Sequence, residues 1–569
     1  MLKLINLSER EAGHYPDCPK NKVMDIENSS SITTPYNSIR DIYNQILVKR
    51  ITNPKKHKKR HGKKHKHNGN FDNDEITYKS HDDISYAFGE KVKSLESPAC
   101  KENNVPDSML LELKDSGFHF GRKSLTHYVG KSQDTDVHIL IIGGPGSCKT
   151  AGTIMPTIET WQGHIVVIDV KPKGDLLPHC ERLSKISGRH VMVFNPHNKD
   201  SFSIDPYDLL RSDGKKNLAR NAKELALALI TPQLEIGDTV WIKSAQNLLA
   251  GAIIYYFELG ATFIETMTAI QLLSVERLII DINNSENLVA KIYISKLKGL
   301  KPETLAGIGM DLIDLAVLVA DPTIESALCC TEESRVISWN DLNTETEPCT
   351  IVLQIPEENL DVWAPMTKLL LNQLIRTLQR RQDKYSEDGK KLPPVLIMLD
   401  EFASLGKISS IKSGLSTLRS RGVTFCLVIQ SLNQLDEIYG PMARRTIFDI
   451  CSFKAFLNVT DPDSQKYCSD LIGSITVANR GVSTSYNPSD GRMIGYSMNV
   501  NETKTPRIQP HEFATLKDVV IMTPDGYCRV EKAPYYEQFG DTFVMQQPLR
   551  SSSESIMYFE NYNDLIMEE

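Results

Sequence analysis

A glycine-rich turn between an apolar run and a helical pattern offers the clearest chemistry in the chain. Residues 137–153 read VHILIIGGPGSCKTAGT and match the phosphate-binding pattern G-x-x-x-x-G-K-[ST] from Gly143 to Thr150 at all but one position. Backbone N–H groups of such a loop and the following helix N-terminus attract phosphates, the lysine reaches the outer phosphates, and the hydroxyl binds Mg²⁺. We therefore expect Lys149 to be catalytic and Thr150 to bind Mg²⁺. The expected nucleotide-contacting residues are Gly143, Gly144, Pro145, Gly146, Ser147, Cys148, Lys149, Thr150 and Ala151.

The one mismatch to the pattern is Cys148, which stands where the pattern has its second glycine. The side chain of Cys148 adds bulk where backbone must approach phosphate closely, so it should weaken nucleotide binding unless the turn shifts. The same thiol lies next to Lys149 at a helix N-terminus, a setting that lowers a cysteine pKa. We expect a thiol-sensitive nucleotide site: bound nucleotide should protect Cys148 from alkylation, and Cys148→Gly should bind nucleotide more tightly. A degenerate site remains the alternative.

An acid pair follows a second apolar run. Residues 394–401 read PVLIMLDE, in which a buried strand would deliver Asp400 to Mg²⁺ and place Glu401 to polarise an attacking water. By itself, this run is equally consistent with a strand that ends in solvated acids. Its combination with the glycine-rich loop favours the catalytic interpretation.

Strands and helices around these residues predict an α/β fold. The order strand, glycine-rich loop, helix, strand (164–169, HIVVID) forms a βαβ unit, hence a parallel sheet, with Asp169 at the carboxyl edge where ligands gather. Further strands are expected at 118–122, 191–195, 350–355, 423–430 and 453–457, with an edge strand at 519–522. Helices are expected at 217–230, 240–257, 265–273, 304–319, 363–381, 408–420 and 461–473, and a mobile polar loop at 479–505.

These elements suggest five segments. The boundaries are a flexible N-terminal region (1–117), the first part of a nucleotide-binding domain (118–209), an all-α insertion (210–343), the second part of the nucleotide-binding domain (344–545) and an acidic flexible tail (546–569).

Composition indicates a protein of ordinary globular type with one unusual tract. Net charge is −7, yet residues 55–67 (KKHKKRHGKKHKH) hold seven Lys, one Arg and four His, so the rest of the chain carries −15 (−7 minus eight positive charges). Such a block is usually a solvated linker. Contact with anionic lipid headgroups or nucleic-acid phosphates is the second interpretation, and metal binding by the histidines is the third. The eleven cysteines form no C-x-x-C pair and no signal peptide is evident, which indicates a reducing cytoplasm.

Several blocks in order resemble the type IV secretion coupling proteins of the VirD4/TraG group, the ATPases of bacterial conjugation. They are IIGGPGSCKTAGTIMPTI, TWQGHIVVIDVKPKGDLL, FNPHNKDSFSIDPYDLL, LDEFASLGKISSIKSGLSTLRSRGVTFCLVIQSLNQLDEIYG and DPDSQKYCSDLIG. The fourth block is the most diagnostic. The resemblance covers residues 118–545.

This resemblance implies a RecA-like P-loop ATPase domain, interrupted by an all-α domain, that forms a hexamer on the cytoplasmic face of the bacterial inner membrane. Such a protein would bind ATP and Mg²⁺, recruit a relaxase–DNA complex or effector proteins, and deliver them to the secretion channel. Gln430 matches a glutamine that senses the γ-phosphate. Arg419 matches an arginine finger that acts on the neighbouring subunit's nucleotide, and Arg421 is the second candidate for that role. The alternative interpretation of Arg419 is a solvated arginine at a helix end, where the helix dipole favours a positive charge.

One departure concerns membrane attachment. Many members of the group begin with a pair of membrane helices, whereas the longest apolar run found here is only Leu248–Phe257. We expect attachment through a partner, with peripheral contact by the basic tract as an option. Two other functions remain open: a catalytically impaired substrate receptor, or a cytoplasmic DNA pump of the FtsK/HerA type.

Overall fold

The structure is a computed structural model that describes residues 105–538, except 125, 172–173, 232–238, 332–333, 345, 382, 387 and 487–492. The basic tract 55–67 and the acidic tail 546–569 lie outside the described residues.

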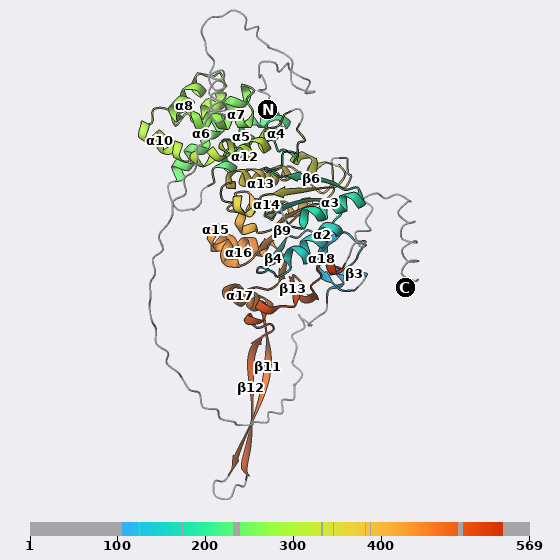
Figure 1. The fold of residues 1–569 in the computed structure, drawn as a ribbon. Coiled ribbons are helices and arrows are strands. Elements are labelled where there is room, and N and C mark those ends of the chain that lie inside the picture. The colour runs from blue at the N-terminus through green and yellow to red at the C-terminus, as the bar shows by residue number, and fades with distance from the viewer. Residues whose placement is uncertain are drawn as a thin grey trace, which may run out of the picture. The chain divides into compact units, whose positions relative to one another are not determined.

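Twelve strands form one sheet, in the order β1-β3-β2-β14-β13-β10-β4-β9-β8-β5-β7-β6 (Figure 1). From β10 to β6 all neighbours pair in parallel, and the pairs from β1 to β10 are antiparallel. The parallel strands are nearly all apolar and buried, as expected for strands covered on both faces. Their bounds are β4 (Ile139–Ile142), β5 (His164–Asp169), β6 (His190–Phe194), β7 (Cys349–Gln354), β8 (Val395–Leu399), β9 (Val423–Ile429) and β10 (Phe453–Phe456). The antiparallel strands are β1 (Leu110–Glu112), β2 (Gly117–Arg122), β3 (His127–Ser132), β13 (Asp518–Thr523) and β14 (Gly526–Glu531).

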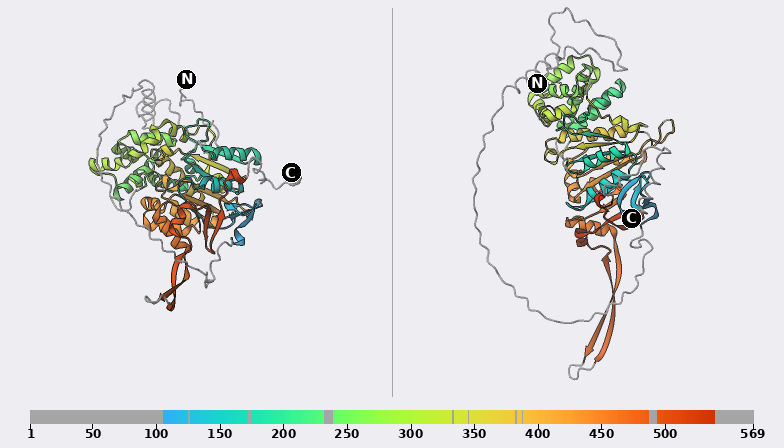
Figure 2. Two further views of the ribbon diagram at one scale, coloured as in Figure 1. Left: turned by 60° about the horizontal axis from the view of Figure 1, so that its bottom comes forward. Right: turned by 45° about the vertical axis from the view of Figure 1, so that its right-hand side comes forward.

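Helices cover both faces of the parallel strands (Figure 2). On one face, α2 (Met155–Thr160) and α3 (Leu176–Ser187) pack on alternate strand residues such as Ile141 and Val428. On the other face, α14 (Ile411–Thr417) contacts His138 and Phe425, whose positions alternate with those of the first set. This two-faced burial is what a strand of continuous apolar residues requires.

An all-α segment lies between β6 and β7 in the chain. Its main helices are α5 (Leu218–Leu229), α6 (Thr239–Glu258), α7 (Phe263–Leu272), α8 (Val275–Asn284), α9 (Leu288–Ile294), α10 (Pro302–Met310), α11 (Val317–Ala320) and α12 (Pro322–Leu328). The expected helix at 304–319 is wrong as one element, because α10 ends at Met310 and a 3-10 turn (Ile313–Ala316) precedes α11. Two glycines and Asp311 lower helix propensity at that break. Among the described residues, no helix has both the length and the apolar character needed to cross a membrane.

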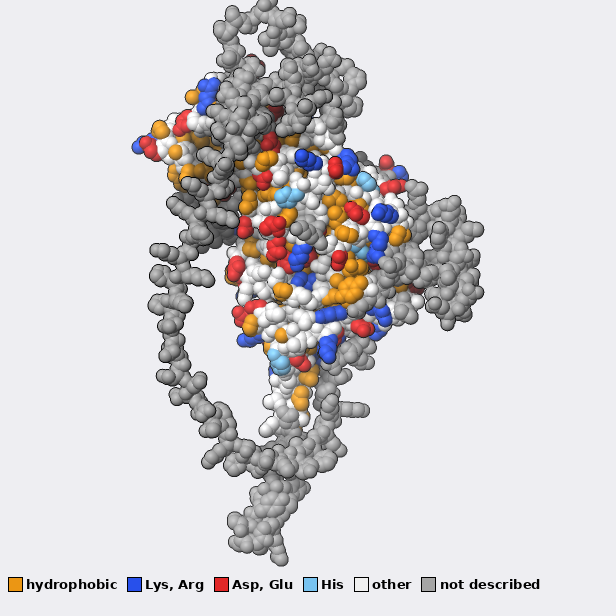
Figure 3. Space-filling model, viewed as in Figure 1, with side chains coloured by type: hydrophobic (Ala, Val, Ile, Leu, Met, Phe, Trp, Pro, Cys, Tyr) orange, Lys and Arg blue, Asp and Glu red, His pale blue; other side chains and the backbone are white. Residues whose placement is uncertain are grey.

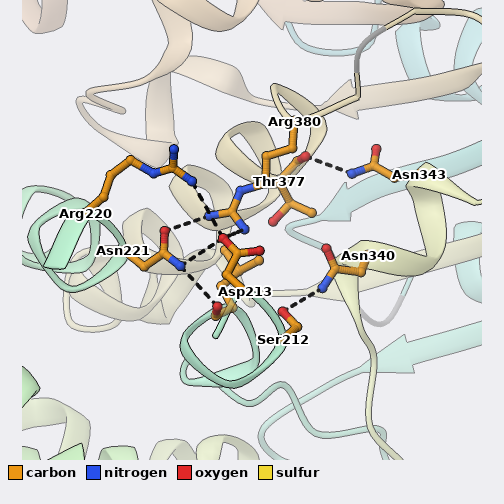
Figure 4. A network of polar contacts seen from close by, with 9 residues as sticks. Ser212, Asp213, Arg220, Asn221, Asn340, Asn343, Thr377 and Arg380 are labelled. Atoms are coloured by element: carbon orange, nitrogen blue, oxygen red, sulfur yellow. Dashed lines mark hydrogen bonds and ion pairs between the residues drawn. The ribbon is translucent and has the colours of Figure 1, made fainter. Parts of the chain in front are cut away.

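A polar network fastens this segment to the helix α13 (Ala364–Leu378), which leads toward β8 (Figure 4). Arg380 donates to Asp213 and, at 2.9 Å, to the Asn221 side-chain oxygen, and Asn221 donates to Asp213 at 2.9 Å. On the returning connection, Asn343 donates to the Thr377 carbonyl at 2.8 Å. Both connections of the all-α segment therefore meet the carboxyl end of α13.

Three further expectations are corrected. The stretch 479–505 is largely a separate two-stranded antiparallel sheet, with β11 (Ser474–Tyr486) paired to β12 (Met493–Pro506), rather than a mobile loop. The strand expected at an edge, β13, lies inside the sheet between β14 and β10. Regular structure begins before residue 118, because β1 already belongs to the large sheet.

Candidate nucleotide-binding site

The glycine-rich loop follows β4 at the carboxyl edge of the sheet. Its first two amides are used within the protein: Gly143 donates to the Ile429 carbonyl at 3.0 Å and Gly144 to the Asn458 carbonyl at 2.6 Å. A Cβ on Gly144 would lie 3.1 Å from that carbonyl oxygen, so the loop depends on glycine there. The helix after the loop begins with a π-helical turn, Thr150–Ile154, a feature that is common at functional sites.

Cys148 has a φ of 75°, in the left-handed region that favours glycine. The loop therefore keeps the backbone conformation for which the pattern normally supplies glycine. A side chain in this conformation carries a strain of about 1–2 kcal/mol. The sequence predicts that the Cys148 side chain adds bulk where the loop backbone approaches phosphate. The structure adds a second effect, backbone strain at Cys148, which the sequence pattern alone did not reveal.

Lys149 lies almost fully buried under the loop. Its ammonium donates to the carbonyls of Gly143 at 2.8 Å and Gly144 at 2.9 Å. Burial lowers the pKa of Lys149, while the nearby carboxylates of Glu401 and Asp400 oppose that shift. The lysine is therefore held at the loop, beside the acid pair.

The acid pair follows β8, as the sequence predicts. Asp400 accepts a hydrogen bond from the Thr150 hydroxyl at 3.0 Å, which joins the two side chains expected to bind Mg²⁺. Burial raises the pKa of Asp400, and the hydrogen bond from Thr150 opposes this shift. Glu401 has a φ of 54°, a strained conformation of the kind that clusters at active sites.

Gln430 reaches the same place from β9, the strand between β4 and β8. Its side-chain amide donates to a Glu401 carboxylate oxygen at 2.8 Å. This contact orients Glu401 and connects the glutamine expected to sense the γ-phosphate with the acid expected to polarise water. Neighbouring strands thus bring Lys149, Thr150 and Glu401 together at one edge.

A second polar chain continues along the carboxyl edge beyond β8. Asp169, at the end of β5, accepts from the Gln354 side chain at 3.1 Å and from the Lys171 amide at 3.0 Å. Gln354 in turn accepts from Asn195 at 3.0 Å. Asp169 therefore lies at the edge expected for it, held by residues from three strand ends.

Arg419 lies away from this cluster, in the 3-10 turn Arg419–Arg421 before β9. The turn is at the amino end of β9, whereas the loop follows the carboxyl end of the parallel strand β4, about 20 Å away along a seven-residue strand. Burial lowers the pKa of His138, which directly precedes β4, and the hydrogen bond to the Leu415 carbonyl opposes this shift. The positive charge of Arg419 makes a smaller contribution that lowers the pKa, as expected if Arg419 lies near the amino end of β4. Arg419 is exposed, and Arg421 donates to the Gln379 carbonyl. A finger role for Arg419 toward its own chain's loop is inconsistent with this distance.

The family model of type IV secretory system conjugative DNA transfer matches residues 96–558, most of the chain. The chain belongs to this family. Curated relatives include the protein VirD4 of Agrobacterium fabrum, 26% identical over 408 residues, a match that covers 70% of this chain and 58% of VirD4. The conjugal transfer protein TraG of Escherichia coli is 22% identical over 427 residues, 68% of this chain and 64% of TraG. The chain thus spans less than two thirds of the length of either relative.

Solved coupling proteins share the fold. The conjugative coupling protein TrwBdeltaN70, in a trigonal form with sulphate, superposes with a TM-score of 0.57 at 14% identity, covering 81% of this chain and 96% of that one. The plasmid coupling protein TrwB in complex with ADP and Mg²⁺ gives 0.55 at 15% identity, over 71% of this chain and 87% of that one. These matches confirm the RecA-like α/β fold predicted from the sequence.

The sequence motifs of this coupling protein do not include Asn458, although it binds the glycine-rich loop directly. Asn458, just after β10, supplies the carbonyl that binds the Gly144 amide, and it belongs to no motif. Only the pairing of β10 beside β4 reveals it.

Proposed function

We propose that this chain is an ATP-driven coupling protein, which recruits DNA–relaxase or effector-protein substrates and delivers them to a type IV secretion channel. One observation carries the proposal: beside Lys149, Thr150 donates to Asp400 at 3.0 Å and Gln430 donates to the adjacent Glu401 at 2.8 Å. This combination is what phosphoryl transfer from a nucleotide requires.

The residues present fit ATP and Mg²⁺. The Thr150 hydroxyl and the Asp400 carboxylate are both oxygen ligands of the kind Mg²⁺ prefers. The Ser147 hydroxyl is buried and, among the described residues, is without a hydrogen-bond partner, so it is available to a phosphate oxygen. Mg²⁺ bound there would neutralise charge on the phosphates. No preformed group of three or more His, Cys, Asp or Glu ligands occurs in the described part of the chain, and Mg²⁺ with phosphates and waters does not need one.

Each protein group then has a distinct task in hydrolysis. Lys149 exchanges its contacts with the loop carbonyls for contacts with the outer phosphates. Glu401 accepts a proton from the attacking water, and Gln430 holds that carboxylate in position. Asp400 and Thr150 would hold Mg²⁺ when it is bound.

We further propose that Arg419 completes the site of a neighbouring subunit in a homo-hexamer. Its exposure, and its place at the sheet edge opposite its own loop, support action on another copy rather than on its own nucleotide. An arginine finger stabilises charge on the transferring phosphoryl group and contributes about 10³–10⁵ in rate.

The all-α segment is the proposed substrate-facing part, on the cytoplasmic side of the inner membrane. Exposed apolar side chains occur along it, and Figure 3 shows hydrophobic side chains gathered around α8 and α10. Its exposed large apolar residues include Ile280, Leu288, Ile292, Met310 and Ile313. Such surface is suited to protein contact.

The alternative, a receptor without turnover, is favoured by one observation, the strained Cys148 in the loop. ATP hydrolysis measured with and without DNA, on the wild type and Lys149→Ala under reducing conditions, separates the two. We expect turnover in the wild type and a loss of about a hundredfold or more in the variant. Absence of turnover in the wild type with DNA present would refute the motor and leave the receptor.

A further inference from the structure

Asn458 joins three separate parts of the fold at the back of the glycine-rich loop. Its backbone carbonyl accepts from the Gly144 amide at 2.6 Å. Its side-chain oxygen accepts from the Lys532 ammonium, and its side-chain nitrogen donates to the Ala514 carbonyl at 3.3 Å. A cation requires the oxygen and a carbonyl requires the N–H, so the two partners orient the amide unambiguously.

Lys532 is the anchor of this arrangement. It follows β14, is partly buried, and also donates to the Leu516 carbonyl at 2.8 Å. Burial lowers the pKa of Lys532, while nearby Cys148 and Asp518 oppose the shift, which is consistent with an ammonium close to the loop. A charge-assisted hydrogen bond of this kind is stronger than a neutral one.

The contacts around Gly144 show why this matters for the loop. The Leu457 amide donates to the Ile142 carbonyl at 2.9 Å and extends the β10–β4 pairing up to the loop. A Cβ on Gly144 would lie 3.1 Å from the Asn458 oxygen and 3.2 Å from Thr460. Residues 457–460 therefore pack directly against Gly144, and a small shift of this segment would move the loop.

We propose that Lys532 and Asn458 are a positioning pair. They hold residues 457–460 against Gly144 and thereby keep the glycine-rich loop in its phosphate-binding conformation. Neither side chain needs to touch nucleotide, because both act through the Asn458 carbonyl. The expected consequence for ATP rests on the proposed function, whereas the consequence for the loop itself does not.

The test is hydrogen exchange by mass spectrometry on the full-length, ligand-free protein. Lys532→Met removes the ammonium and keeps most of the aliphatic stem. We expect the peptide that contains Gly144 to exchange about fivefold faster, with β8 peptides unchanged. Lys517→Met, an exposed lysine nearby, is the matched control and should exchange like the wild type.

Three further variants distinguish a local effect on the loop from a general loss of structure. Asn458→Leu preserves volume and the backbone carbonyl but loses both side-chain contacts, so it should give the same local change. Combining it with Lys532→Met should add little, because both break one link. Lys532→Arg keeps the charge and should restore part of the protection.

For ATP, Lys532→Met should raise the KM about tenfold with kcat within about twofold, because the loop binds phosphates in the ground and transition states alike. Wild-type exchange at the loop in both Lys532→Met and Asn458→Leu would overturn the proposal, and so would equal acceleration across the whole sheet. Failure of the wild type to bind ATP would refute the proposed function but leave the exchange result decisive for the pair.

Discussion

Replacement of Cys148 by glycine separates backbone strain from thiol chemistry at the loop. With a φ of 75°, the wild-type residue carries about 1–2 kcal/mol of left-handed strain. Glycine removes this strain but adds about 0.5–1 kcal/mol of unfolded-state entropy. The net gain in the free energy of unfolding is therefore small, roughly 0.5 kcal/mol.

The effect on ATP affinity has an upper limit set by the same strain. Because φ is already positive without nucleotide, part of the strain is present in the free loop and does not change on binding. The remainder is at most about 2 kcal/mol, so Cys148→Gly should bind ATP more tightly by no more than about thirtyfold. Cys148→Ala is the matched control, since it removes the thiol but keeps the Cβ and hence the strain.

Calorimetric titration with ATP and Mg²⁺ on the wild type and both variants measures this difference. We expect the glycine variant to bind more tightly, and the alanine variant to bind like the wild type. Alkylation of the wild-type thiol should be slowed by bound nucleotide. Equal affinities for the two variants, or weaker binding by Cys148→Gly, would refute the strain argument.

Three other predictions concern assembly, acid stability and the basic tract. Mixing Arg419→Ala subunits with Lys149→Ala subunits should restore some ATP hydrolysis at mixed interfaces, and no recovery in any ratio would argue against a finger that acts between subunits. The buried His138, whose pKa is lowered to about 4 chiefly by burial, stays neutral in the fold, so the unfolded chain binds the proton first. The free energy of unfolding should then fall by roughly 3 kcal/mol from this residue as pH decreases from about 6.5 to 4, and urea titrations that show no such slope would contradict it. Deletion of residues 55–67 should weaken binding to anionic liposomes or DNA in a salt-dependent manner, and unchanged binding would support a linker.

The parallel part of the fold was predictable because its strands are short apolar runs. Several of them end at or directly before a residue that the motifs identify, such as Gly143, Asp169 or Asp400. Runs such as 164–169 and 423–430 appear as β5 and β9 within a residue of their expected ends. The strand before the glycine-rich loop and the strand before Asp400 were equally clear, since burial on both faces leaves a continuous apolar run.

The long hairpin was not predictable in the same way. The strands β11 and β12 are rich in Ser, Asn, Thr and Gly, so composition favours a loop, and cross-strand pairing over the whole hairpin overrides that preference. The interior place of β13 was hidden for a different reason. Its pairing with β14 is a local hairpin with only Pro524 and Asp525 between the strands, whereas its pairing with β10 joins segments that are distant in the sequence. Local propensity carries no information about that second pairing.

At the site, the motifs identified the side chains expected to bind phosphate and metal, but not the residues that position those side chains. Asp400, Glu401 and Gln430 follow strands that are neighbours only in the folded sheet. The apolar run before the two acids predicts their roles and the family resemblance implies that of Gln430, without reference to which strands pair. Asn458 and Lys532 have no local signal at all, since their importance arises from contacts across the fold.

The most direct test of the central claim is a comparison of Mg²⁺–ATP binding and single-turnover hydrolysis in the wild type and Glu401→Gln. The variant keeps the shape of the side chain, yet it cannot accept the proton of the attacking water. We predict that both proteins bind ATP with similar affinity and that hydrolysis in the variant falls by about 10²-fold or more. Hydrolysis by Glu401→Gln at the wild-type rate, or no ATP binding by the wild type, would contradict the account.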